Sequence, residues 1–313
     1  MTVEFKQVKN DVKITSTPWM RLIPTLKASF KYILLTASLT VAVSFFISHF
    51  LGLFLLLFTP EGLEVMSVPI KGVPVIIYPT PVVIPLEINV GSLFIILWTF
   101  QLSCLLIAIT SREGVLTTVR NTLKGSVKSI FKSNIISTPL IANATLLTVL
   151  AIYTLQEAQG IPTGALPETN RYKFYFLLTQ ASIFEELTFR VFLIGVFEAV
   201  TTLHLYSLTH PNERKLKRSA IFLRALLFPH KTLESLGLKD VWRKERMGLT
   251  PEEWFILALS SVMFGSAHVL SGIGWEIGKV THATLVGVVL GLMYMKFGFQ
   301  ASIILHWFFN NYF

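Results

Sequence analysis

Long runs of apolar residues limit what this chain of 313 residues can fold into. A helix that crosses the hydrocarbon core of a membrane needs about 20 apolar residues, because each residue adds about 1.5 Å to its length. The segments that meet or approach this length are 32–58, 92–109, 135–155, 174–205, 254–270, 277–295 and 299–313. The last is short enough to be tilted, partly inserted or packed inside a bundle. The sequence therefore predicts an all-α fold, a polytopic transmembrane helical bundle with about seven to eight membrane helices.

Composition excludes a soluble protein and argues against a nucleic-acid partner. Hydrophobic residues make up 52% of the chain and charged residues only 14%, which is too little polar surface to face water on all sides. The formal net charge is +9, but the basic residues lie between the apolar runs rather than in one patch. We therefore expect them to contact the anionic headgroups of membrane lipids at the basic loops, with no nucleic acid as a partner.

The loop charges also predict an orientation. Six basic residues precede residue 32, five lie in the loop 110–134 and ten in the loop 206–253. Cytosolic loops carry an excess of Lys and Arg, so the N-terminal lead-in 1–31 and both basic loops are predicted to be cytosolic. The chain is then a multi-pass integral protein of the cell membrane, and residues 174–205 must cross once, as one long or kinked helix.

Three connecting segments have patterns of their own. Six prolines lie in residues 59–91, a spacing that argues against a helix and predicts an extended loop or small hairpin. Residues 116–131 repeat a basic residue every four positions, which predicts an amphipathic helix on the cytosolic membrane surface; the alternative is a solvated loop helix. In the basic insert 206–253, residues 220–228 are helix-like but too short to span.

Charged residues lie inside the fourth apolar run, where ionisable groups are costly and often functional. Glu186 and Arg190 are spaced i, i+4 with the acid first, which favours an ion pair on one face of a helix. Glu185 projects about 100° away from that face and has no counter-ion on its own helix at that spacing. Desolvation should therefore raise its proton affinity, which makes it a candidate general base. The alternative is that all three residues form a buried polar clasp between helices.

Two further polar motifs, with three polar residues in all, lie in later apolar runs. His268 ends the sequence Phe264-x-x-x-His268, and His306-x-x-x-Asn310 places an imidazole and an amide on one helical face. Such a pair could donate two hydrogen bonds to one oxygen atom. Taken alone, His268 is more often an interhelical hydrogen-bond partner, and the pair could simply lie near the water interface.

The three motifs together resemble those of the CPBP family, the CAAX-protease and bacteriocin-processing family. The resemblance covers about 174–313, so the chain divides into the lead-in 1–31, N-terminal membrane helices 32–173 and a CPBP-like catalytic core 174–313 that carries the insert. It implies an intramembrane endopeptidase that uses no metal and no cofactor and acts on a peptide or protein, possibly lipidated.

The resemblance also implies roles for individual residues. Glu185, assisted by His268, would activate the water that attacks the peptide carbonyl. His306 and Asn310 would bind the oxyanion. Glu186 and Arg190 would support the site, with Glu186 able to share the proton transfer.

Several alternatives remain open at this point. Two His and two Glu could instead bind Zn²⁺, although no His-Glu-x-x-His motif occurs. The polar cluster could serve a membrane scaffold, an immunity factor or a transporter without catalysis.

The insert is longer than expected for simpler relatives, and the predicted orientation puts His268 near the outer end of its helix. The remaining histidines are predicted to be ordinary packing, interface or loop residues: His49, His204, His210, His230 and His282.

Overall fold

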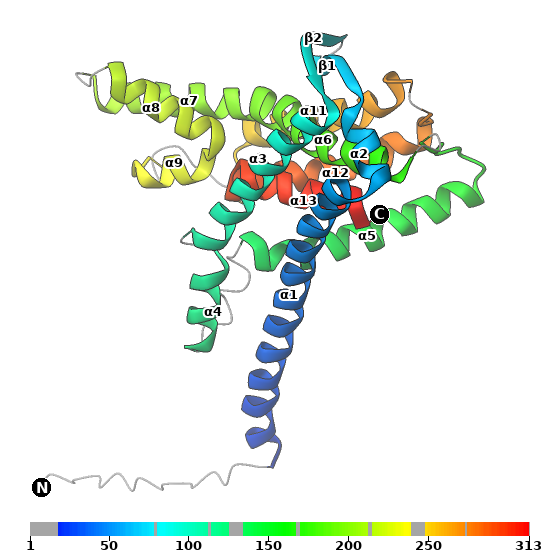
Figure 1. Cartoon of the computed structure of the whole chain (residues 1–313). Helices are drawn as coiled ribbons and strands as arrows, with labels where there is room; N and C mark the ends of the chain where they lie inside the picture. The colour runs from blue at the N-terminus through cyan, green and yellow to red at the C-terminus, as the bar shows by residue number, and fades with distance from the viewer. Residues whose placement is uncertain are drawn as a thin grey trace, which may run out of the picture.

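The architecture is a bundle of helices with one small β-hairpin at its edge (Figure 1). The computed structural model describes residues 18–77, 80–111, 114–124, 134–166, 170–211, 215–238, 248–272 and 274–312. Every predicted apolar run is a helix: α1 (Pro18–Phe58), α3 (Val90–Thr110), α5 (Asn134–Ala158), the continuous helix from α6 to α7, α11 (Pro251–Leu270), α12 (Ile277–Phe297) and α13 (Phe299–Tyr312). The predicted all-α polytopic bundle is therefore confirmed.

Within the described residues, not every apolar helix is long and apolar enough to cross a membrane. Within the described residues, five helices are long and apolar enough to cross a membrane, or up to six if a bent pair of helices forms one span. That bent pair joins Phe46–Phe58 of α1 to α2 (Pro60–Ser67) at an angle of 80°. α13 has only 14 residues, or a length of about 21 Å, so it is too short to cross the hydrocarbon core of about 30 Å.

The short helix α13 lies at the centre of the bundle. It packs against α3, α5, α6 and α12, and its residues from Phe299 to Phe309 are all buried (Figure 1). An apolar helix that is covered on every side belongs to a core, which fits the predicted packing inside the bundle. Gly298 makes the turn into α13 with a φ of 96°, a backbone conformation that favours glycine.

The proline-rich segment is only partly as predicted. Residues Pro69–Ile77 (β1) and Thr80–Asn89 (β2) form an antiparallel hairpin, which confirms the predicted alternative of a small hairpin. The prediction that no helix forms here was wrong, because α2 occupies Pro60–Ser67. Pro60 stands at the start of this helix, where its missing N–H costs nothing, and Thr59 caps it by accepting a hydrogen bond from the Gly62 N–H at 3.1 Å.

The basic segments are described in part. α4 (Val115–Leu123) forms the first half of the predicted amphipathic helix and belongs with α3 to one apolar stretch, so its position on the membrane surface stays a prediction. The insert contains α8 (Lys215–Leu227), longer than the predicted 220–228, and α9 (Pro229–Ser235). Parts of the predicted segments lie outside the described residues: 1–17, 125–133, 212–214 and 239–247.

α11 and α12 pack closely at Gly265. A Cβ atom added there would lie 2.6 Å from the backbone oxygen of Val280 and would also overlap the Thr284 side chain. Small residues let membrane helices approach one another in this way. Because backbone atoms cannot move aside, we expect Gly265→Ala to destabilise the protein by about 1–3 kcal/mol. The thermal unfolding temperature in detergent measures this loss, and Ala258→Val on the exposed face of α11 is the control that should change little.

Candidate active site

The fourth apolar run changes its helical winding at the predicted motif. α6 (Arg171–Glu186) continues into a π-helical segment, η2 (Leu187–Gly195), and then into α7 (Val196–Thr209). The run that was predicted to cross once, as one long or kinked helix, forms one continuous helix of 39 residues, and the crossing itself stays a prediction. Wider turns of this kind are rare and occur often at functional sites. Ser260 on α11 donates a hydrogen bond of 2.5 Å to the Phe189 carbonyl within the π-helical segment.

Glu186, Arg190 and His306 form a sealed polar group inside the bundle. The Arg190 Nε atom lies 3.5 Å from Glu186 Oε2, which is the predicted i, i+4 ion pair, and both side chains are 0% exposed. His306 Nδ1 lies 2.9 Å from the other oxygen of Glu186. Arg190 also donates to the Gly287 carbonyl at 3.4 Å, so three helices meet at this pair. A charged group is stable in a protein interior only when oppositely charged or hydrogen-bonding groups offset the loss of its hydration.

Glu185 contacts the other nitrogen of the same histidine and is itself partly exposed. Its Oε2 atom lies 3.5 Å from His306 Nε2, and its side chain is 23% exposed. His306 therefore has one carboxylate at each ring nitrogen, although a neutral imidazole has only one N–H to donate. Of the two glutamates, only Glu185 is partly exposed at the surface of the protein.

The Phe264 ring connects the three motifs. It lies 4.5 Å from the Arg190 guanidinium carbon, and its centre lies 4.9 Å from that of the His268 ring and 5.6 Å from that of His306. His268 is half-buried, and its Nδ1 lies 2.9 Å from the Phe264 carbonyl of its own helix. In the neutral ring this bond puts the proton on Nδ1 and leaves Nε2 as the acceptor.

Hydrogen bonds between α6 and its neighbours hold the two glutamates in place. Gln101 on α3 donates to Ser182 at 2.9 Å, and the Trp307 indole on α13 donates to Thr179 at 3.3 Å. Asn310 donates from its amide to the Leu178 carbonyl at 3.2 Å. Asn310 thus contacts the backbone of α6 in this structure, and the predicted pairing of His306 and Asn310 as oxyanion donors stays a prediction.

The C-terminal part of the chain is similar to a known protein family. A family model described as Type II CAAX prenyl endopeptidase Rce1-like matches residues 167–312. This part of the chain, somewhat less than half of its length, is similar to that family. No curated protein and no solved structure matches the chain. This similarity supports a peptidase of the CAAX endopeptidase type with a peptide or protein substrate, and the apolar helices support a multi-pass membrane protein.

All six predicted site residues lie within the Rce1-like region, on α6, η2, α11 and α13. The structure brings Glu185, Glu186, Arg190 and His306 into contact and places His268 beside them across Phe264. Sequence reasoning did not single out Lys279, a basic residue in the first turn of α12. Its Nζ atom lies 3.9 Å from the centre of the Trp275 ring. Its place in the apolar run 277–295 was a signal that could have identified it.

Proposed function

We propose that this chain is an intramembrane endopeptidase that hydrolyses a peptide bond with water activated by Glu185, without a catalytic metal. The observation that carries the proposal is the pair of unequal glutamates. Glu185 is partly exposed and lies 3.5 Å from His306 Nε2, whereas its neighbour Glu186 is 0% exposed and paired with Arg190. One carboxylate is thus available to water and the other fixes the geometry around it.

The proposed reaction needs one base and two proton transfers. Glu185 takes a proton from a water molecule, and the water oxygen forms a bond to the carbonyl carbon of the peptide. The C–N bond breaks as the amine nitrogen receives that proton, and an acid and an amine leave the site. His306 would orient the Glu185 carboxylate through its Nε2 atom. His268 would assist through its Nε2 atom, and the oxyanion would be bound by His306 or Asn310.

The proposed substrate is a peptide segment that ends in a CAAX sequence with a prenylated cysteine. The proposal rests on the family description of residues 167–312 and on the site lying inside an apolar bundle, where a lipid chain adds to binding. We assign catalysis to residues 174–313. From the loop charges, we also propose that the N-terminus faces the cytosol.

Detergent-purified protein should cleave a prenylated CAAX peptide and cleave the same peptide without its prenyl group more slowly. Released fragments are identified by mass spectrometry. Because no metal enters the proposed chemistry, at least half of the rate should remain after treatment with a strong chelator, when assayed below the unfolding temperature of the treated protein. A complete and metal-reversible loss under these conditions would support a metal hydrolase instead. Intact peptides in every assay of folded protein would favour a scaffold.

A further inference from the structure

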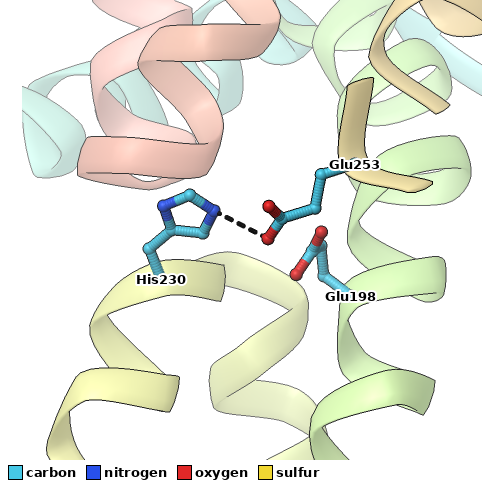
Figure 2. Close-up of side chains that lie close together, drawn as sticks. All are labelled: Glu198, His230 and Glu253. Atoms are coloured by element: carbon cyan, nitrogen blue, oxygen red, sulfur yellow. Dashed lines mark hydrogen bonds and ion pairs between the residues drawn. The ribbon is translucent and has the colours of Figure 1, made fainter. Parts of the chain in front are cut away.

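Three side chains that can bind a metal lie close together where α9 of the insert packs near α7 and α11, away from the candidate active site. Glu198 lies on α7, His230 on α9 and Glu253 on α11, and Figure 2 shows the three pointing toward one another. One donor atom from each side chain lies within 4.8 Å of the others. The sequence had given His230 no partner, but its Nε2 atom lies 3.2 Å from Glu253 Oε1.

Surrounding structure holds these donor atoms in place. Glu253 is 4% exposed and Glu198 is 2% exposed. The second oxygen of Glu253 accepts the Thr250 N–H at 2.6 Å within a capping box at the start of α11, so its Oε1 is directed toward His230. His230 follows Pro229 in the first turn of α9, where the proline sets the backbone. Three helices that are distant in sequence therefore fix the group.

We propose that Glu198, His230 and Glu253 bind a divalent transition-metal cation of the Zn²⁺ or Mn²⁺ class. One imidazole nitrogen with two carboxylate oxygens suits such ions better than Mg²⁺ or Ca²⁺, which prefer oxygen alone. Metal–ligand bonds of about 2.1 Å in a tetrahedral site put ligand atoms about 3.4 Å apart, close to the 3.2 Å between His230 and Glu253. A divalent cation would also offset the repulsion between two buried carboxylates.

The proposed metal site is separate from the candidate active site. Glu198 follows Glu186 by 12 positions on one continuous helix, so several residues of the π-helical segment separate the two sites along the helix axis. A cation here would not touch the reacting peptide. It would tie α9, and through it the basic insert, to α7 and α11, which gives the insert a fixed place against the bundle.

The test measures cation binding directly, and no peptidase assay is needed. Protein prepared without a histidine tag is stripped with a chelator, and Zn²⁺, Mn²⁺ and Mg²⁺ are each titrated calorimetrically. We expect one Zn²⁺ or Mn²⁺ per chain, with Mg²⁺ much weaker, and a higher unfolding temperature in the loaded protein. His230→Ala and Glu198→Gln should each weaken binding at least 10-fold. His204→Ala, at an exposed position on α7, is the matched control and should bind like the parent.

Each outcome decides the proposal. Folded parent protein that binds none of the transition-metal ions would overturn it, as would unchanged binding in both His230→Ala and Glu198→Gln. Circular dichroism verifies folding, and the isosteric Glu198→Gln keeps the test valid if His230→Ala fails to fold. Binding that is lost in Glu185→Gln but kept in His230→Ala would place the ion at the candidate active site and overturn both this inference and metal-independent catalysis. Absence of peptidase activity with intact binding would overturn the proposed function alone.

Discussion

Glu185→Gln should lower the rate of peptide hydrolysis by at least about 100-fold and leave a folded protein. The substitution exchanges one oxygen for a nitrogen, and the resulting amide cannot take a proton from water. Loss of a general base lowers the rate by about 100- to 10,000-fold. Stability should change little, because the Glu185 side chain is 23% exposed and its contact to His306 is long, at 3.5 Å. Initial rates of prenylated-peptide cleavage and the unfolding temperature are measured on the same preparation.

The matched control for this variant is Glu252→Gln. Glu252 lies in the first turn of α11 and is exposed, so its amide variant should keep the parent rate. A Glu185→Gln protein that cleaves at the parent rate would refute the proposed base. A Glu185→Gln protein that does not fold would be replaced by Glu185→Asp, which keeps the carboxylate but moves it away from His306, and we expect an intermediate rate.

The second large effect is on stability and arises at Arg190. Arg190→Met should destabilise the protein by about 3–5 kcal/mol, because it leaves the fully buried Glu186 carboxylate without its guanidinium partner. It also removes the donor to the Gly287 carbonyl and the contact over the Phe264 ring. Unfolding temperature and chemical denaturation in detergent report the change.

A second substitution at Glu186 makes this prediction specific. The double variant Glu186→Gln, Arg190→Met should be more stable than Arg190→Met alone, because it removes the uncompensated charge as well. Arg224→Met on the exposed side of α8 is the control and should cost little. If the double variant is no more stable than the single one, the loss at Arg190 comes from packing rather than from charge.

Much of the fold follows from apolar run length, because a spanning helix must satisfy its own backbone hydrogen bonds. Each of the seven runs became a helix for this reason. The sequence does not determine which runs cross the membrane and which pack inside. α13 is as apolar as its neighbours, and only its length and the helices around it place it at the centre. The prolines correctly argued against a long helix in this segment. They did not argue against α2, because a proline at the first position of a helix does not interrupt it.

The candidate site was predictable wherever one helix determines the geometry. The spacing of Glu186 and Arg190 alone gave their ion pair. The contacts of His306 with both glutamates depend on the relative register of α6 and α13, which no spacing within either helix encodes. The π-helical winding of Leu187–Gly195 and the neighbours of His230 depend in the same way on packing between helices.

The distance in sequence between Glu186 and His306, 120 positions, has a consequence for biosynthesis. While the chain is being made, the two glutamates enter the membrane long before the histidine that bridges them exists. Until α13 is in place, the incomplete protein has the two glutamates and Arg190 but not the imidazole that contacts both glutamates. On the proposed mechanism, a polypeptide released before that point would lack the histidine that orients Glu185 and should not cleave peptides.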